Sequence, residues 1–312
     1  GNLLDGETRK TSQDIRELRV LDSACGSGSF LIYAYQILAE FYQAEIQRLS
    51  RQHEQLVKDI ASNLTEILLD DRVNAQRIED ERDFIRLHYR RLILEKHIYG
   101  VDLDPQAAEI AVVNLMMRAM ERKGQDKRLP LILNQNVKVG NGLIGLRPDD
   151  SRLADHAEPL ATIRRLRAEL IDTSNIDPRH EGIIDELKTA TECLYAEFHV
   201  DYSDHFTNLD RVRPFHWAVE FPEVFFDEDG KPLDNAGFHI IFGNPPWEIV
   251  KPDLREFYAQ FDPDIESKLT RKKAEKRIAE LNAEDPRYEV AYNQQKITIE
   301  ESAKYFRATG DY

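Results

Sequence analysis

Four short apolar runs constrain the fold of this chain more than any other feature. They are residues 18–22 (LRVLD), 97–102 (HIYGVD), 136–140 (NVKVG) and 238–242 (FHIIF), and each is rich in Val, Ile, Leu or Phe. Such runs are typical of strands that are covered on both faces. Because helical segments separate them, the pattern predicts βαβ units and a mainly parallel sheet in an α/β fold.

The segment after the second run carries the signals of a helix. Asp104 stands at the N-cap position and Pro105 at the first helical position, where its missing N–H costs nothing. Gly124 is expected to end the helix. The apolar residues that we expect to face the core are Ile110, Val113, Leu115, Met117 and Met120.

Two long helical insertions interrupt this alternation of strands and helices. Residues 36–95 carry apolar residues near heptad spacing, which predicts a packed helical hairpin or a short coiled coil. Residues 151–205 are expected to form a second helical pair, and residues 248–312 a charged helical segment. The chain opens on Gly1 and stops without a closing element, so we interpret residues 1–312 as a partial domain of a longer protein.

Composition narrows the class of protein. No apolar run approaches the ~20 residues that span a membrane, so no membrane partner is expected. The chain has 2 cysteines, Cys25 and Cys193, whose separation favours a reducing, cytoplasmic setting over a disulfide scaffold. The net charge of −15 disfavours nucleic-acid binding by this chain alone, because phosphate neutralisation drives such binding. A basic domain elsewhere in the protein would remove that objection.

A glycine-rich turn follows the first run, in the stretch DSACGSGSFL at residues 22–31. A strand, a glycine turn and a helix form a nucleotide-binding arrangement, in which Gly26 and Gly28 permit close approach of a ligand. Leu31 occupies the third glycine position of the dinucleotide fingerprint and no Walker A lysine follows, so the site suits a ligand without a pyrophosphate. Asp22 can meet a cationic group there. An ordinary βα turn, with glycines used for geometry alone, is the alternative.

Polar residues also follow the second and third runs. Asp102 ends the second run, where an acidic residue in a doubly wound fold commonly accepts hydrogen bonds from ribose hydroxyls. A solvated loop carboxylate is the alternative for Asp102, and Asp104 is better explained as a helix cap. Asn141 lies between two glycines after the third run, and it is either a simple turn residue or a contact to an adenine edge.

The fourth run ends in IIFGNPPWEIV, residues 240–250. An amine conjugated to a ring is a poor nucleophile, because its lone pair is delocalised. The side-chain oxygen of Asn244 and the backbone carbonyl of Pro245 can accept hydrogen bonds from such an amine and draw it out of plane, without a base that must titrate. Pro245 and Pro246 preorganise these acceptors, and Trp247 offers a face for a flipped base. An Asn-Pro turn with a core tryptophan is the alternative.

Taken in order, LDSACGSGSF, IYGVDLDP, VGNGLIG and IIFGNPPW resemble the motifs of amino-group DNA methyltransferases that use S-adenosylmethionine. The cofactor motif precedes the catalytic one, as in the gamma class of adenine-N6 enzymes. The insertions and the stretch FHWAVEFPEVF at residues 215–225 resemble the methylase region of type IIG (Eco57I-like) restriction–modification enzymes and of BREX-type phage-defence methylases. The resemblance covers residues 18–250 and implies a Rossmann-like methyltransferase fold with long helical insertions.

The resemblance implies methyl transfer from S-adenosylmethionine to the amine of a flipped adenine at a specific site in double-stranded DNA. It makes Asp102 the ligand of the ribose hydroxyls and Asn141 the contact of the cofactor's adenine. It implies no metal, and its catalytic residues are Asn244, Pro245, Pro246 and Trp247. Its cofactor-binding residues are Asp22, Ala24, Cys25, Gly26, Ser27, Gly28, Phe30, Asp102, Leu103, Asn141 and Gly142.

Three positions depart from the family pattern. Ser23 stands where proline is usual, Asn141 often appears as aspartate, and Trp247 is more often tyrosine or phenylalanine. The later strands of the sheet and a target-recognition domain are not visible in the sequence, so we expect the basic DNA-reading surface to lie outside these residues. Defence-system subunits are further expected partners.

Two other classes of function stay open. Enzymes with an Asn-Pro-Pro-aromatic string also methylate protein glutamine side chains and RNA amino groups, and a methylase-like fold can serve as a non-catalytic scaffold. The string does not separate adenine from cytosine. Residues 215–225 are interpreted mainly as packing, and His216 lacks a second metal ligand at a suitable spacing. The run RKKAEKR at 271–277 is either a solvated helix face or a phosphate contact.

Overall fold

The structure is a computed structural model that describes residues 10–62, 69–120, 132, 134–173, 177–244 and 252–309. The chain divides into two compact units. The first, here called the sheet unit, comprises residues 1–194 and 214–245, and the second, the helical unit, comprises residues 195–213 and 246–312. The sheet unit contains every residue of the candidate site that the structure describes.

In the described residues, the sheet unit has four parallel strands in the order β3-β2-β1-β4. The strands are β1 (Val20–Asp22), β2 (Ile98–Asp102), β3 (Val137–Val139) and β4 (Ile240–Phe242). Each lies within one of the four apolar runs, so the predicted parallel sheet and the α/β fold class are confirmed. Because all four strands are parallel, their carboxyl ends meet at one edge of the sheet.

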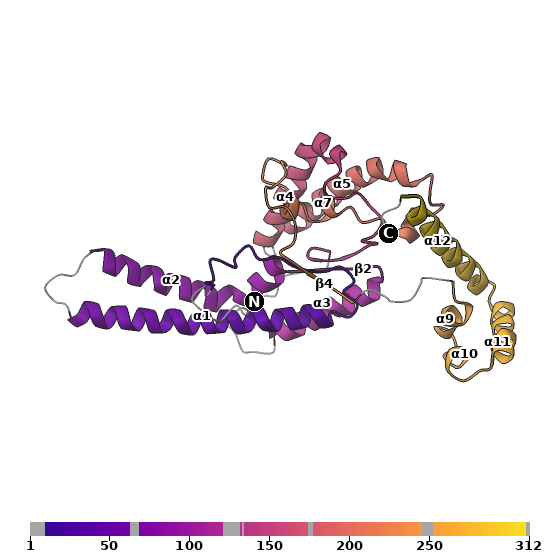
Figure 1. Ribbon diagram of the computed structural model, residues 1–312, viewed down its shortest axis with the longest axis horizontal. Coiled ribbons are helices and arrows are strands. Elements are labelled where there is room, and N and C mark those ends of the chain that lie inside the picture. Colours follow the sequence, from indigo (N-terminus) through magenta and orange to yellow (C-terminus); the bar gives the residue numbers. More distant parts are fainter. Residues whose placement is uncertain are drawn as a thin grey trace. The chain divides into compact units, whose positions relative to one another are not determined.

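The connection from β1 to β2 is a long helical hairpin (Figure 1). It consists of α1 (Ser29–Ser62), α2 (Leu69–Leu92) and a π-helical turn, η1 (Ile93–His97). α1 starts directly after the glycine turn and continues without a break into the predicted insertion. One helix therefore forms both the helix that follows β1 and the first arm of the insertion. α1 and α2 run side by side, which favours the packed hairpin. The predicted insertion limits, 36–95 and 151–205, stay predictions.

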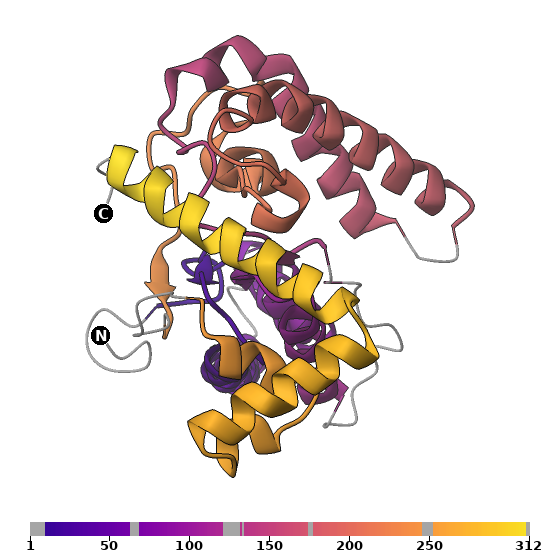
Figure 2. The ribbon, with the colours of Figure 1, turned by 90° about the vertical axis from the view of Figure 1, so that its right-hand side faces the viewer.

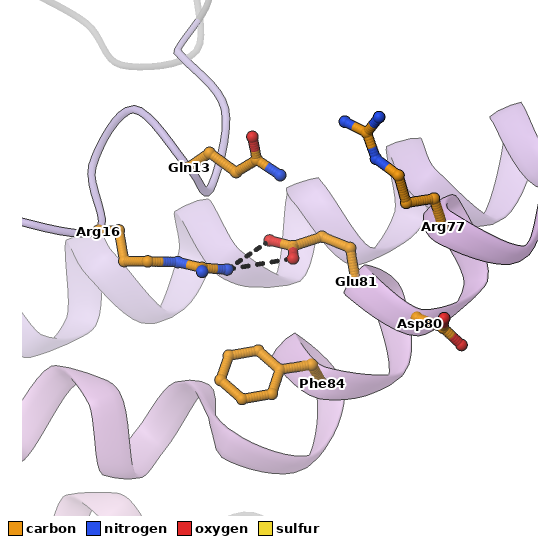
Figure 3. Close-up of a pocket in the computed structure, with 6 residues that line it drawn as sticks. All are labelled: Gln13, Arg16, Arg77, Asp80, Glu81 and Phe84. Carbon is orange, nitrogen blue, oxygen red and sulfur yellow. Dashed lines mark hydrogen bonds and ion pairs between the residues drawn. The ribbon is translucent and has the colours of Figure 1, made fainter. Parts of the chain in front are cut away.

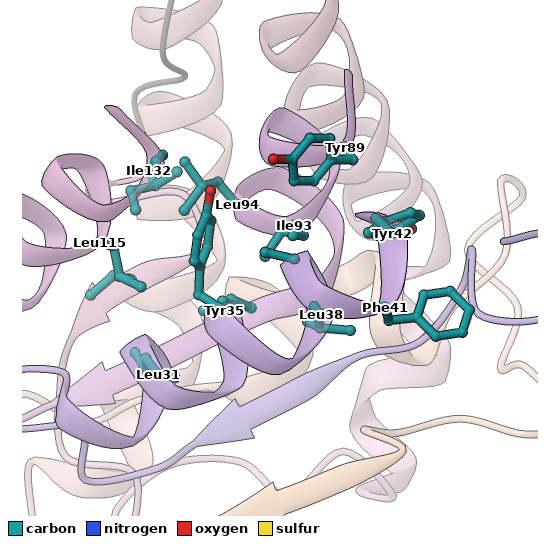
Figure 4. Close-up of a cluster of buried hydrophobic side chains, with 14 of the residues drawn as sticks. Leu31, Tyr35, Leu38, Phe41, Tyr42, Tyr89, Ile93, Leu94, Leu115 and Ile132 are labelled. Atoms are coloured by element: carbon teal, nitrogen blue, oxygen red, sulfur yellow. The ribbon is translucent and has the colours of Figure 1, made fainter. Parts of the chain in front are cut away.

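A core cluster fills the space between the sheet and the helices α1, η1 and α3 (Pro105–Met120) (Figure 4). Leu31, Tyr35, Leu38 and Tyr42 come from the first turns of α1 and are all buried. Leu31, the residue at the third glycine position of the dinucleotide fingerprint, is fully buried against Gly100, where an added Cβ would lie 2.8 Å from its Cδ1. Apolar packing therefore anchors the start of α1, and with it the turn before the helix.

The helix α3 (Pro105–Met120) forms where the sequence predicts it, but its predicted core face is wrong. Its buried residues are Ala108, Ala111, Val112, Leu115 and Ala119, so only Leu115 of the expected set is in the core. Ile110, Val113, Met117 and Met120 are 50%, 55%, 59% and 69% exposed. The small residues on the buried face let the helix approach the sheet closely. The face that packs on the sheet is therefore the one with small side chains and not the one with the most hydrophobic side chains. The expected helix stop at Gly124 lies outside the described residues.

The connection from β3 to β4 is also helical. It contains η2 (Ser151–His156), α4 (Ala157–Asp172), α5 (Arg179–His199), α7 (Trp217–Glu220) and α8 (Pro222–Phe225). Two partly buried ion pairs hold α7 and α8 in place. Arg167 of α4 binds Glu223 of α8 with two hydrogen bonds of 2.8 and 2.9 Å. Lys138 of β3 contacts Glu220 of α7 at 2.5 Å. These pairs hold the segment 215–225 against the sheet.

The helical unit has a small core of its own. Besides η3 (Val200–Tyr202) and α6 (Leu209–Val212), it contains α9 (Leu254–Ala259), α10 (Asp264–Ser267), α11 (Arg271–Glu284) and α12 (Arg287–Thr309). Figure 2 shows α11 and α12, in gold and yellow, as successive helices joined by a sharp turn. Tyr258, Ile265 and Ile278 are buried in its core. In the described part of the chain, no helix is long and apolar enough to cross a membrane.

Candidate active site

The glycine turn between β1 and α1 uses its two glycines for different purposes. Gly26 (φ +51°) and Gly28 (φ +83°) both adopt the left-handed conformation that favours glycine. A Cβ on Gly28 would lie 2.9 Å from the Cβ of Ala111, so this glycine lets α3 pack against the turn. A Cβ on Gly26 would meet no atom within 4 Å, so its exposed side is open to a ligand.

Asp22 ends β1 with a carboxylate that is fully buried. Its Oδ1 accepts the Ala24 N–H at 3.2 Å, whereas its Oδ2 is buried and has no hydrogen-bond partner in the described residues. Burial raises the pKa of Asp22, the Ala24 hydrogen bond lowers it, and the negative charge of Asp102 raises it further. A buried acceptor without a donor is unfavourable. This oxygen therefore fits a cationic group of a ligand.

Asp102 ends β2 and links two loops. Its Oδ2 accepts the Gly26 N–H at 2.7 Å, and its Oδ1 accepts the Asp104 N–H at 2.9 Å. Asp102 therefore makes protein contacts with both carboxylate oxygens, unlike a solvated loop carboxylate. Its contact with ribose hydroxyls stays a prediction, for which each oxygen retains a second lone pair. Asp104 is confirmed as the helix cap, because its Oδ1 accepts the Gln106 N–H at 2.9 Å.

The loop after β3, residues 140–146 and here called the adenine loop, lies next to β2. Its first N–H, that of Gly140, donates to the Asp102 carbonyl at 2.8 Å. The Oδ1 of Asn141 accepts the Leu143 N–H at 3.2 Å, so the side chain acts as a turn residue. The adenine contact expected of Asn141 and of Gly142 stays a prediction. The structure does place both residues at the carboxyl edge of the sheet, one strand beyond Asp102.

The end of β4 comes next to Asp22. Asp22 pairs in register with Phe242, and a Cβ on Gly243 would lie 3.2 Å from Oδ1 of Asp22. Asn244 follows directly and is exposed. The sheet therefore brings Asn244 within two residues of the strand position opposite Asp22, although 222 positions separate them in the numbering. Pro245, Pro246 and Trp247, the other predicted catalytic residues, lie outside the described residues.

The remaining predicted cofactor residues differ in accessibility. Phe30 is 48% exposed with its ring 5.8 Å from that of Phe242, and Leu103 is 51% exposed. Ser27 is exposed, and Ala24 is half-buried. Cys25 is buried, and burial, followed by the charges of Asp102 and Asp22, raises the pKa of its thiol to about 12. Cys25 therefore carries a neutral side chain that packs beneath the turn.

Residues 215–217 contact the adenine loop, a role that the sequence did not reveal. The Nε1–H of Trp217 donates to the Gly142 carbonyl at 3.0 Å, and Nδ1 of His216 accepts the Leu146 N–H at 3.0 Å. The aromatic composition of this stretch signalled packing but not its target. In the described part of the chain, no group of three or more His, Cys, Asp or Glu side chains is placed to hold a metal ion.

A separate cavity of about 320 Å³ lies between residues 13–16 and α2 (Figure 3). The guanidinium of Arg16 reaches both carboxylate oxygens of Glu81 at 3.1 Å and lies 5.5 Å from the ring centre of Phe84. None of the predicted site residues lines this cavity, whose other lining residues are Gln13, Arg77 and Asp80. Two arginines and two acids line it, so their charges balance.

Comparison with known proteins places this chain in a family. Residues 96–277 match the model of the Eco57I restriction-modification methylase, and residues 5–147 match that of the MmeI DNA-methyltransferase domain. A putative type II restriction enzyme and methyltransferase of Methanocaldococcus jannaschii is 21% identical over 319 residues, covering 80% of this chain and 24% of that protein. A type II restriction enzyme and methyltransferase of Escherichia coli is 26% identical over 144 residues, covering 43% of this chain and 12% of that protein.

A search of the solved structures finds no significant match to this chain. The aligned regions span only 24% and 12% of the length of the two relatives. The first family model, however, covers more than half of the chain and includes β2, β3 and β4 with the loops that follow them. On this evidence, the chain belongs to the Eco57I restriction-modification methylase family.

Proposed function

We propose that this chain is the methyl-transferring part of a site-specific DNA adenine-N6 methyltransferase that uses S-adenosylmethionine. One observation carries the proposal: the buried Oδ2 of Asp22, which has no hydrogen-bond partner among the described residues, lies at the strand end that pairs with the segment leading into Asn244. Asp22, which suits a cationic group, and Asn244, which suits an amine, thus lie at the same edge of the sheet. Family membership supports methyl transfer as the reaction that needs both.

The residues of the glycine turn and of the two neighbouring strand ends fit S-adenosylmethionine. When bound, this cofactor supplies an electrophilic methyl group on a sulfonium. Asp22 accepts a hydrogen bond from its ammonium group, which satisfies the buried oxygen. The open side of Gly26 admits its methionine part, and Asp102 holds its ribose hydroxyls. Asn141 and Gly142 contact its adenine.

Asn244 prepares the target amine. The side-chain oxygen of Asn244 and the backbone carbonyl of Pro245 accept hydrogen bonds from the two amine protons, which localises the nitrogen lone pair for attack on the methyl carbon. An amide keeps this acceptor at any physiological pH, so no general base is needed before attack. The methylated amine then loses one proton to solvent. Pro246 stiffens the turn, and Trp247 stacks on the flipped adenine.

The wider context is a restriction–modification or phage-defence enzyme acting on double-stranded DNA in the cytoplasm. The names of the two relatives, each a type II restriction enzyme and methyltransferase, support this part of the proposal. The net charge of −15 means that other surfaces must neutralise the DNA phosphates. The chain itself would then supply the chemistry and another domain the sequence recognition.

The test maps modified bases in a host that lacks its own DNA methylation. The gene that encodes this chain is expressed as the natural protein, alongside Asn244→Ala and a matched control, Asn74→Ala, at an exposed position of α2. Single-molecule sequencing of the host chromosome then locates modified bases. We expect N6-methyladenine at one recurring sequence in the wild type and in Asn74→Ala, and none in Asn244→Ala.

Two outcomes would count against the proposal. If a soluble wild-type protein that binds S-adenosylmethionine leaves the chromosome unmodified, DNA is not its substrate, and protein or RNA amines become the candidates. If Asn244→Ala modifies DNA as well as the wild type does, Asn244 does not hold the target amine.

A further inference from the structure

We infer that Trp217 is a positioning residue for cofactor binding, because its hydrogen bond to the backbone of the adenine loop (residues 140–146) holds that loop in place. The inference rests on the proposed function, which assigns the cofactor's adenine to this loop. Trp217 lies on α7, and its indole N–H donates to the carbonyl of Gly142 at 3.0 Å. Neither the sequence motifs nor the proposed chemistry gives this side chain a role.

The whole adenine loop is attached to residues 214–217. Asn141 forms a parallel bridge with Pro214, and the Phe215 N–H donates to the Ile144 carbonyl at 2.6 Å. The Leu146 N–H donates to Nδ1 of the fully buried His216. These contacts hold Asn141, Ile144 and Leu146 through backbone groups, whereas only the Trp217 indole bonds Gly142 in the described structure.

Two glycines allow this close approach. A Cβ on Gly140 would lie 2.5 Å from Cδ2 of Phe215, and a Cβ on Gly145 would lie 2.1 Å from the Phe215 carbonyl oxygen. Gly142 is similarly close to Trp217, since its Cβ would lie 3.0 Å from Cζ2 of the indole. The loop backbone therefore rests directly on the ring and backbone of Phe215 and on the Trp217 indole. Its position follows the position of these two residues.

Trp217 also contacts the segment that leads to the catalytic asparagine. Its ring lies 6.2 Å from that of Phe238, which precedes β4, and 6.2 Å from that of Phe221. Phe221 and Phe238 both make edge contacts with Tyr99 of β2, at 5.2 Å. One indole thus touches the loop that receives the cofactor's adenine and the approach to the strand that presents Asn244. Trp217 therefore links the position of the adenine loop to the position of the strand that presents Asn244.

The indole N–H is the feature to test, because the ring alone can be approximated by another aromatic side chain. Trp217→Phe keeps a ring in the cluster but leaves the Gly142 carbonyl without its donor. A neutral hydrogen bond of this kind corresponds to about a five- to tenfold change in an equilibrium constant. Phe225→Leu is the matched control: Phe225 is buried in the same cluster, with its ring 6.1 Å from that of Phe238, and lies on α8.

The experiment measures binding of S-adenosylmethionine and of its demethylated product, S-adenosylhomocysteine, to the natural protein that contains this chain by calorimetry, with Tm recorded for each variant. We expect Trp217→Phe to raise both Kd values about five- to tenfold. Phe225→Leu should lower Tm but leave both Kd values within about twofold of the wild type. Equal affinity of Trp217→Phe and the wild type, or equal weakening by both variants, would overturn the inference.

A second measurement decides the question should Trp217→Phe fail to fold. The chain has 2 tryptophans, so in Trp247→Phe the fluorescence reports Trp217 alone. Adding S-adenosylhomocysteine should shift its emission, because the ligand orders the loop that the indole holds. An unchanged spectrum with binding shown by calorimetry would contradict the positioning role. A folded natural protein that contains this chain and binds neither ligand would instead overturn the proposed function, and this inference with it.

Discussion

The backbone N–H of Gly26 donates a 2.7 Å hydrogen bond to Oδ2 of Asp102 and so joins the glycine turn after β1 to the end of β2. The other oxygen of the same carboxylate accepts the Asp104 N–H at the start of α3. One side chain therefore fixes the relative positions of two loops that the proposed cofactor must contact together. Its removal affects both the geometry of the site and the stability of the fold.

Replacement of Asp102 tests its effect on the stability of the fold. Asp102→Ala leaves the N–H groups of Gly26 and Asp104 without their acceptor, and we expect a loss of about 2 kcal/mol in the free energy of unfolding. Asp102→Asn keeps one acceptor oxygen and should cost about half as much. Urea titration of both variants checks the order. Equal stability of Asp102→Ala and the wild type would show that the two hydrogen bonds do not stabilise the fold.

Asp22→Asn should change stability and binding in opposite directions. Burial raises the pKa of Asp22 by disfavouring the charged carboxylate, so a neutral amide of the same size removes an unfavourable charge and should raise Tm. The same change removes the counter-charge of the ligand's ammonium, and S-adenosylmethionine should bind about tenfold more weakly or worse. Calorimetric titration and a thermal melt of the same sample test both. A variant with unchanged affinity would show that Asp22 does not meet the cation.

The two glycines of the turn offer a matched pair of substitutions. Gly28→Ala places a methyl group 2.9 Å from the Cβ of Ala111 at φ +83°, so it should destabilise the chain by about 2 kcal/mol or more. Gly26→Ala meets only open space and should cost about 1 kcal/mol, from its backbone conformation alone. Its methyl group enters the proposed ligand space, however, and should weaken cofactor binding. Chemical denaturation and calorimetry together distinguish the two, and a reversed order of stability would contradict these roles.

The sequence identified the four strands correctly because each lies in a short run rich in Val, Ile, Leu or Phe. β1 and β2 are buried, as expected of strands covered on both faces, but that expectation is wrong for β4, where Ile240 and Ile241 are 46% and 64% exposed. The sequence also located the cap at Asp104, because capping depends on neighbouring residues alone. The face of α3 could not be predicted in this way. Ile110 and Met117 are more hydrophobic than Ala108 and Ala111, but Ala111 packs beside Gly28, a contact formed only in the folded chain.

The candidate site shows the same division between local and distant information. The motifs placed Asp22, Asp102, Asn141 and Asn244 at strand ends, and the parallel sheet brings those ends to one edge. The support of the adenine loop by residues 215–217 was not predictable, because 70 positions separate Leu146 from His216. That Oδ2 of Asp22 has no hydrogen-bond partner in the described part of the chain was not predictable either, since it depends on every group that surrounds the side chain.

Glu95 predicts a pH dependence of stability. The side chain is buried in η1, and burial raises its pKa from 4.5 to about 7, although a 2.7 Å ion pair with Arg91 opposes the shift. The folded chain therefore binds this proton more tightly than the unfolded chain does. The stabilisation from the protonated form is complete below about pH 4.5 and is lost as the pH rises through about 7.

The measurement compares the free energy of unfolding of the wild type and of Glu95→Gln across this range. Glutamine does not titrate, so the difference between the two proteins isolates Glu95 from other groups, including the buried His97, whose pKa burial lowers. The wild type should gain stability relative to Glu95→Gln as the pH is lowered from about 8 to about 5. A difference that stays constant with pH would show that Glu95 is ionised to the same extent in both states.

The central claim is methyl transfer to the amine of adenine, and the most direct measurement follows the methyl group itself. The natural protein that contains this chain is incubated with unmethylated DNA and S-adenosylmethionine carrying a deuterated methyl group, and the DNA is digested to nucleosides for mass spectrometry. We predict deuterated N6-methyldeoxyadenosine from the wild type and none from Asn244→Ala. Deuterium in cytosine, or in no nucleoside although the cofactor binds, would contradict the claim.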